Sequence, residues 1–158
     1  MLTFITRPTD PQAVKVAACA ELSKSAVKIV EWSKAKKLDD SDFPPFSGRQ
    51  LALLLEDGSV LGDVNAMARY LMYDIGSSSA SSSSSPGSLC PSHTAEWWIE
   101  WEEVVLRPMV YGGSRSDVLS ALQELVASVS GNGSYLAGDA LGLEDVVVGC
   151  TLRAGVLM

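Results

Sequence analysis

Residues 51–71 hold, without a gap, the signals of a hairpin followed by a helix. Asp57-Gly58 lies between alternating apolar residues, a pattern that favours a tight turn because glycine tolerates a positive φ. Asp63 can then cap a helix by accepting hydrogen bonds from amides of its first turn. Apolar residues follow at helical spacing: Val64, Met67, Ala68 and Leu71. The stretch therefore predicts a strand, a turn, a second strand and a helix in direct succession.

A strand-helix-strand pattern precedes this stretch. Residues 2–5 are predicted to form a strand, and Val27 and Ile29 belong to a second one. The helix predicted between them has an apolar stripe of Val14, Ala17, Ala18 and Leu22. The short connection favours a right-handed crossover, which places the two strands in parallel. With the hairpin and helix that follow, the order is that of a thioredoxin-like domain over residues 1–75.

Two segments are predicted to lack regular structure. Residues 33–50 carry charges, Pro44-Pro45 and Gly48, which predicts a loop with at most a fragment of helix. Residues 76–88 are almost pure serine and glycine, a composition that buries too little apolar surface to offset the entropy of ordering the chain. This tract is predicted to be a linker between residues 1–75 and a second domain over residues 89–158.

The second domain is predicted to be helical. A helix over about residues 94–106, ending near Pro108, has a broad apolar face: Trp97, Trp98, Trp101, Val105 and Met109. A second helix contains Val118 and Val129 and ends before the glycines at 131 and 133. A third begins near Leu143 with Asp145 in its first turn, where free amides and the helix dipole favour a carboxylate. The fold class expected is therefore α/β plus all-α.

Composition argues against several classes of function. The net charge is -7, with only 12 Lys and Arg residues, so no basic surface for nucleic acid is expected. Lys34, Lys36 and Lys37 form a short basic run, interpreted as a solvated helix end or loop. Single cysteines at 19, 90 and 150 suggest neither a disulfide framework nor a zinc site. Without a signal peptide or an apolar run of membrane-spanning length, a cytoplasmic location is expected.

Several segments carry a resemblance to known families. YLAGDALGLEDVVVG resembles a helix start of glutathione transferases. Asp145 stands at the position of the family's Asp, and Gly142 at the position where the family has a Ser or Thr cap. GDVNAMARYL, SHTAEWWIEWEEVVL and residues 117–155 resemble the N-terminal glutathione-transferase-like appendage of eukaryotic cytosolic glutamyl-tRNA synthetases. The appendage of methionyl-tRNA synthetases is nearly as similar. The resemblance implies a thioredoxin-like half and a helical half that is truncated here, since the family's helical half normally continues further.

The resemblance also implies where glutathione chemistry would lie. In the family, a serine after an acidic residue at the start of the third helix binds the γ-glutamyl carboxylate; Asp63 and Val64 occupy these places. A cis-proline precedes the family's third strand, and Leu51 takes its place. The catalytic Ser, Tyr or Cys that the family has at the end of the first strand is missing, with Thr6 and Thr9 as the only hydroxyls nearby. Activation of a thiolate needs a well-placed donor. We therefore expect no catalytic residue, cofactor or metal.

A complete synthetase is not expected either. Class I synthetases use a signature with paired histidines, and this chain contains only His93. Gly112-Gly113-Ser114 is interpreted as a turn between helices, because no strand precedes it as in a phosphate-binding loop. The resemblance therefore implies a non-catalytic protein-protein interaction module of an aminoacyl-tRNA synthetase. Its implied partners are glutathione-transferase-like domains of other synthetases or scaffold proteins, and a dimer is also expected.

Four residues are candidates for such an interface. On the helix after Asp63, three side chains face away from the apolar set and suit a dimer-type contact: Asn65, Arg69 and Met72. Arg153 is the fourth, because the family pairs modules through its helix. The first three residues are also explained by an ordinary solvated helix face. Arg153 is also explained by the favourable interaction of a positive charge with the C-terminus of its helix. The alternatives for the whole chain are a divergent glutathione transferase and a subunit of a translation elongation factor.

Overall fold

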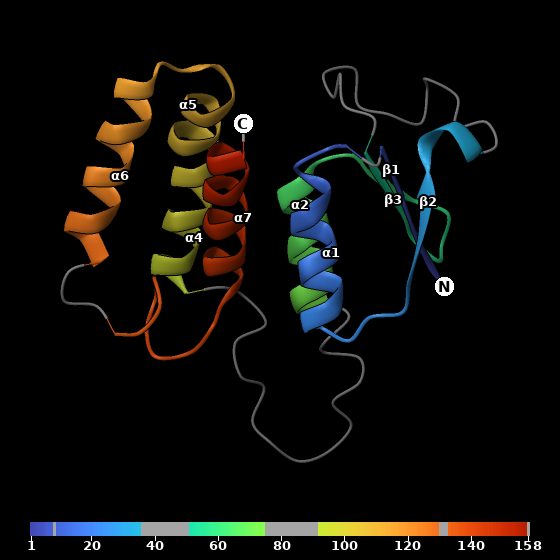
Figure 1. Ribbon diagram of the computed structural model, residues 1–158. Coiled ribbons are helices and arrows are strands. Elements are labelled where there is room, and N and C mark those ends of the chain that lie inside the picture. Colours follow the sequence, from blue (N-terminus) through green and yellow to red (C-terminus); the bar gives the residue numbers. More distant parts are fainter. Residues whose placement is uncertain (8, 36–50, 75–91, 130–132, 158) are drawn as a thin grey trace, which may run out of the picture. The chain divides into compact units, whose positions relative to one another are not determined.

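The computed structural model describes residues 1–7, 9–35, 51–74, 92–129 and 133–157 (Figure 1). The chain forms two compact units, Met1–Ser85 and Pro86–Met158. The serine tract predicted at 76–88, most of the loop predicted at 33–50, and Cys90 lie outside the described residues.

A four-stranded sheet forms the centre of the first unit, with strand order β2-β1-β3-β4. The strands are β1 (Leu2–Thr6), β2 (Val27–Glu31), β3 (Ala52–Leu54) and β4 (Val60–Leu61). β1 pairs in parallel with β2 and antiparallel with β3, and β3 pairs antiparallel with β4. This is the thioredoxin-like arrangement that the sequence predicts.

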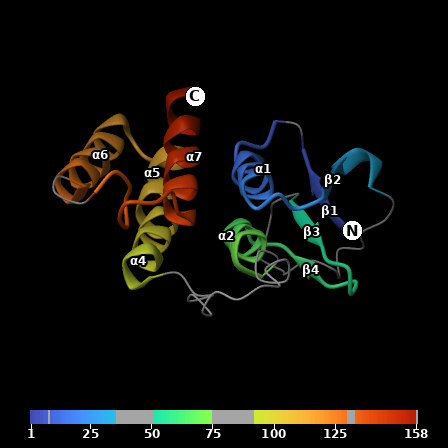
Figure 2. The same cartoon turned by 90° about the horizontal axis from the view of Figure 1, so that it is seen from below.

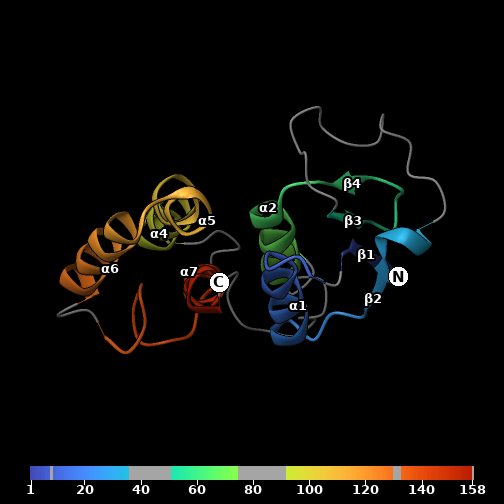
Figure 3. The ribbon, with the colours of Figure 1, turned by 45° about the horizontal axis from the view of Figure 1, so that its top comes forward.

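The helices of the first unit lie on one face of this sheet (Figure 3). They are α1 (Ala13–Leu22) and α2 (Val64–Arg69), which a π-helical segment, η3 (Tyr70–Asp74), extends. A short 3-10 helix, η1 (Trp32–Lys34), follows β2. The fully buried side chains between the helices and the sheet include Phe4, Val16, Leu53, Val64, Met67 and Leu71.

The hairpin between β3 and β4 forms where Asp57-Gly58 predicts it. Gly58 has a φ of 87°, in the region that favours glycine. Asp57 Oδ1 accepts hydrogen bonds from the Ser59 amide at 2.9 Å and the Ser59 hydroxyl at 2.6 Å. Leu55 N donates to Ser59 O at 2.9 Å and closes the turn. These contacts within five residues fix the register of Leu53 opposite Leu61.

The predicted buried face of α1 is wrong, although the helix itself is present. Val14 and Leu22 of the predicted stripe are 36% and 44% exposed. The buried residues of this helix are instead Lys15, Val16 and Cys19. Both sets repeat at helical spacing, and packing against α2 and η3 selects the second.

The second unit is built around one continuous helical segment. It consists of α4 (His93–Trp101), a π-helical turn η4 (Glu102–Leu106) and α5 (Arg107–Gly112). The expected end of the helix near Pro108 is wrong, because Pro108 lies in the first turn of α5 and the helix continues. Proline is tolerated in the first turn of a helix because the amide hydrogen that it lacks would have no partner within the helix there. The turn before it, η4, is π-helical and therefore has a different hydrogen-bond pattern from an α-helix.

Two further helices pack against this segment, on different sides of it (Figures 1 and 2). They are α6 (Arg115–Val129) and α7 (Leu143–Leu157), where the sequence predicts helices. Trp98, Trp101, Leu106, Ala121 and Val148 form the core. Trp98 Nε1 donates to Leu136 O at 3.0 Å. Trp97, which belongs to the predicted apolar face of α4, is 43% exposed.

A buried ion pair joins three helical segments of the second unit. Arg107 Nε and Nη2 donate to the two carboxylate oxygens of Glu102 at 3.1 and 2.7 Å. Thr151 on α7 donates its hydroxyl to Glu102 Oε1 at 2.5 Å. Glu102 and Thr151 are fully buried and Arg107 is nearly so. The pair therefore links η4 and α5 to α7 through one carboxylate.

None of the helices in the described ranges has both the length and the apolar composition needed to cross a membrane.

Candidate functional site

The positions implied for glutathione recognition meet at one end of the sheet. Thr6 ends β1, and Leu51 comes directly before β3, one position beyond the Ile5–Ala52 pair. β4 runs antiparallel to β3 and ends at Leu61, opposite Leu53, at this same end of the sheet. The helix α2 therefore begins here, with Val64. The topology therefore brings together three residues that are far apart in the sequence. The segment 36–50, which leads into this end, lies outside the described residues.

The side chains at this end are mostly enclosed. Leu51 and Val64 are fully buried, and Thr6 is 7% exposed. The Thr6 hydroxyl donates to Arg7 O at 3.1 Å, so its hydrogen already has an acceptor. Every peptide bond in the described ranges is trans. Val64 and Leu51 thus contribute apolar packing at the places where the family has a serine and a proline.

Asp63 holds the start of α2 at this end. It is the N-cap of the helix, and its Oδ1 accepts a hydrogen bond from Ala66 N at 2.8 Å. A carboxylate in this position satisfies an amide that has no partner within the helix. The acidic residue of the family's pair is therefore present and has a structural role, next to an apolar residue.

Solved structures with a similar fold are glutathione transferases. A glutathione transferase from Phanerochaete chrysosporium, solved with oxidized glutathione, has a TM-score of 0.77 and 16% identity, over 99% of this chain and 80% of its own. The chain has the glutathione-transferase fold. A diazinon-metabolizing glutathione S-transferase of the silkworm Bombyx mori has a TM-score of 0.75 and 13% identity, over 98% and 80% of the two chains.

Glutathione S-transferase III in its apo form has a TM-score of 0.72 and 22% identity, over 97% of this chain and 80% of its own. No protein-family model matches the sequence, and no curated protein matches it significantly. At these identities the likeness establishes the fold alone.

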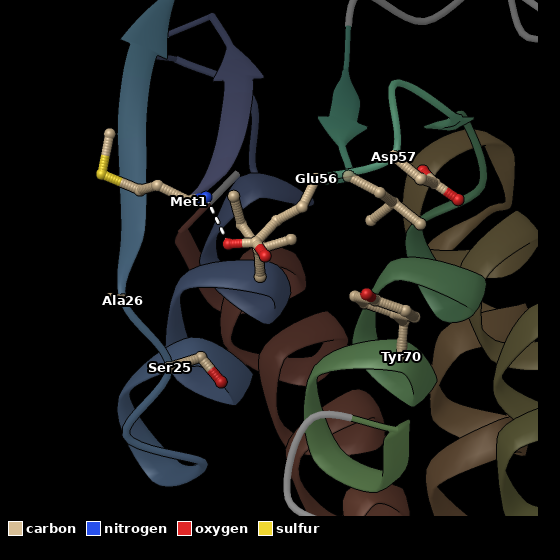
Figure 4. A pocket seen from close by; sticks show the side chains of 8 residues that line it. Met1, Ser25, Ala26, Glu56, Asp57 and Tyr70 are labelled. Carbon is tan, nitrogen blue, oxygen red and sulfur yellow. Dashed lines mark hydrogen bonds and ion pairs between the residues drawn. The ribbon is translucent and has the colours of Figure 1, made fainter. Parts of the chain in front are cut away.

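A pocket lies at the opposite end of the same sheet (Figure 4). Its volume is about 700 Å³, and its walls come from the start of β1, the residues before β2, the hairpin turn and η3. They include Met1, Ser25, Glu56, Asp57 and Tyr70. The Glu56 carboxylate forms an ion pair with the Met1 ammonium group. The sequence did not point to this pocket, because its walls come from four separate segments.

The charges of this pocket disfavour an anionic ligand. Hydrogen bonds from the hydroxyl and the amide of Ser59 lower the pKa of Asp57, so its carboxylate stays ionised at neutral pH. Glu56 adds a second carboxylate on the same wall. Glutathione carries a net negative charge at neutral pH, so this pocket is no substitute for the end of the sheet where the resemblance places glutathione recognition.

The structure rules out one of the four residues predicted to form an interface. Asn65 is fully buried, so the expectation that it faces outward is wrong. α2 packs against both α1 and β4, and this double contact makes its buried arc wider than one apolar stripe. Arg69 and Met72 are half-buried, and Arg153 on α7 is exposed. These three stay candidates for an interface.

The second unit presents an apolar groove. Its volume is about 480 Å³, and its walls are formed by α6, α7 and Leu136. Val126 on α6 is 66% exposed beside it. Asp145 also lines the groove, but its carboxylate accepts from Leu136 N at 2.9 Å and Gly142 N at 2.8 Å. The Asp145 carboxylate is thus engaged, and the other residues that line the groove are apolar.

Proposed function

We propose that the chain is a non-catalytic docking module with the glutathione-transferase fold, of the type appended to glutamyl-tRNA synthetases. The observation that carries the proposal is the burial of Val64 and Leu51 at the end of the sheet where glutathione transferases bind glutathione. A valine side chain offers no hydrogen-bond donor to a carboxylate, and the Thr6 hydroxyl already donates to a backbone carbonyl. Lowering the pKa of a bound thiol requires such a donor.

The partner in this proposal is a second glutathione-transferase-like domain of a synthetase or scaffold protein. Support comes from the motif resemblance in GDVNAMARYL and SHTAEWWIEWEEVVL, which covers both units. Arg69, Met72 and Arg153 are the residues proposed to contact it. The methionyl-tRNA synthetase appendage and an elongation factor subunit share the same fold and the same docking logic.

A divergent glutathione transferase is the second candidate function. It is favoured by the solved structures of similar fold, which are glutathione transferases and include one with oxidized glutathione bound. In this case the segment 36–50 would have to supply the groups that Thr6, Leu51 and Val64 do not.

Retention on immobilised glutathione and conjugation of a generic electrophile separate the two candidates. We expect the chain to show neither. The variant Val64→Ser restores the missing hydroxyl, whereas Val64→Ala removes the same bulk without adding a donor. Weak retention that appears in Val64→Ser and not in Val64→Ala identifies a remnant of the ancestral site. Turnover by the unmodified chain contradicts the proposal.

Analytical ultracentrifugation with glutathione-transferase-like domains of synthetases tests the docking. We expect a one-to-one complex that Arg153→Ala weakens. The matched control is Arg115→Ala, which removes an exposed arginine from α6 of the same unit. Equal effects of the two variants, or a monomer that ignores every such domain, argue against the proposal.

A further inference from the structure

The strand β2 forms one edge of the sheet. It is the outermost strand beside β1, and all five of its residues pair in parallel with β1. On its outer side, Lys28, Ile29 and Val30 meet no other strand among the described residues. An edge strand presents unpaired amide and carbonyl groups, which can pair with another extended chain.

The middle of this edge is apolar and accessible. Ile29 is 61% exposed although it lies at the centre of the strand. Its partner on β1 is Phe4, which is buried under α1, so Val27 and Ile29 face the helical side of the sheet. Proteins commonly protect edges with charges, prolines or bulges. On the helical face, the centre of β2 has an exposed isoleucine instead.

A groove runs between this edge and helix α1. Its volume is about 220 Å³, and Phe4 and Val16 line it on the side of the core. Ala17 and Ala20 form its helical wall, and their small side chains leave room above Val27 and Ile29. The edge and the groove together form a surface, the β2 groove, that offers both backbone pairing and a pocket with apolar side chains along the strand and polar ones, Glu21 and Ser25, near the start of β2.

Charges define what fits the β2 groove. Glu21 lines the groove at the end where β2 begins, and it makes no ion pair within the described part of the chain. Glu31, at the other end, is paired with Lys34 at 3.2 Å. Lys28 is exposed on the opposite face of the strand. A complementary chain has a basic residue near Glu21 and an acidic one opposite Lys28.

We propose that the β2 groove binds an extended peptide segment of a partner protein, which pairs with β2 and becomes a fifth strand of the sheet. Its alternate apolar side chains enter the groove beside Ile29, and its basic side chain meets Glu21. Backbone hydrogen bonds supply the affinity, while the groove selects the side chains. The surface does not include the residues proposed for synthetase docking, so the inference stands apart from the proposed function.

Selection from a library of random short peptides displayed on phage tests the proposal on the full chain. We expect enrichment of peptides with alternating apolar residues and a basic residue. Ile29→Lys should lower the recovery of these peptides by at least about tenfold, because it places a charge in the pocket. Val104→Lys is the matched control, since Val104 is 66% exposed in the second unit. Failure to enrich any peptide above the Ile29→Lys background overturns the proposal.

N-methylation of the selected peptide distinguishes strand addition from other binding. Methyl groups on alternate amides that face β2 should abolish binding, while methyl groups on the intervening amides should leave it unchanged. Ala17→Trp, which fills the groove from an exposed position, should also abolish it. Equal effects of both methylation patterns overturn the proposal. Self-association of the chain that Ile29→Lys prevents overturns it too, because the occupant is then a second copy.

Discussion

Asp63 in the first unit and Asp145 in the second both stand at helix starts, but they stabilise different things. Asp63 accepts a hydrogen bond from Ala66 N, inside the first turn of its own helix. Asp145 accepts from Gly142 N and from Leu136 N, which lies outside the helix in the preceding loop. The first carboxylate secures one helix end, whereas the second also fixes the path of the chain between α6 and α7.

The polar contacts of the hairpin in the first unit and of the buried ion pair in the second differ in the same way. The hairpin of the first unit is held by contacts among neighbours, such as those of Asp57 with Ser59. The second unit places Glu102, Arg107 and Thr151 in a shared buried network that spans 49 residues of sequence. Neighbouring residues therefore hold the hairpin of the first unit, whereas Glu102 connects segments of the second unit that are far apart in the sequence.

Loss of the buried ion pair should give the largest effect. Arg107→Met leaves the Glu102 carboxylate buried without its bidentate partner, and we expect about 3–5 kcal/mol loss in the free energy of unfolding of the second unit. Urea unfolding followed by tryptophan fluorescence measures it, because three of the four tryptophans lie in this unit. The double variant Glu102→Leu with Arg107→Met should recover most of the loss. A single variant as stable as the unmodified chain refutes the role of the pair.

Asp145→Ala should have the next largest effect. It removes the acceptor of two backbone amides, and hydrogen bonds to charged groups contribute about 1.5–3 kcal/mol each, so we expect a loss of about 2–3 kcal/mol after relaxation of the loop. Hydrogen exchange at Leu136 should accelerate together with this loss. Protection that persists at Leu136 would mean that the loop does not depend on the carboxylate.

Asp63→Ala, the matched change in the first unit, should cost less. Loss of an N-cap typically costs about 1 kcal/mol, and here only the start of α2 is affected. The far-ultraviolet circular dichroism and the urea midpoint of the first unit measure the change. Asp63→Asn keeps an acceptor and serves as the control. If Asp63→Ala costs as much as Asp145→Ala, the contrast between the two caps does not hold.

Glu144→Gln should show the smallest effect, with a distinct pH dependence. Burial raises the pKa of Glu144, and the charge of Asp145 raises it further. Ionisation of Glu144 therefore destabilises the folded state. That penalty is complete above the folded pKa and vanishes below the unfolded pKa. We expect the variant to be more stable at neutral pH, and its advantage to shrink as the pH falls through the raised pKa. A difference that does not vary with pH, measured by urea unfolding, contradicts this assignment.

The sequence predicted part of the candidate site and missed the rest. Resemblance to glutathione transferases pointed to Thr6, Leu51 and Val64, and the sheet topology brings these three to one end. The β2 groove was not predicted, because Ile29 has the pattern of an ordinary strand residue. Its exposure depends on β2 being an edge strand and on the small side chains of α1. Neither feature can be recognised within the strand itself.

The sequence alone determined where the strands and most helices lie along the chain, and also the Asp57-Gly58 turn and the cap at Asp63. Each of these features depends on residues only a few positions apart. Tertiary structure decided which face of α1 is buried, that Asn65 is enclosed, that the helix continues through Pro108 and that Glu102 pairs with Arg107 and Thr151. These outcomes depend on which segments pack together. Several local patterns are compatible with each of them, and only the contacts between distant segments select one.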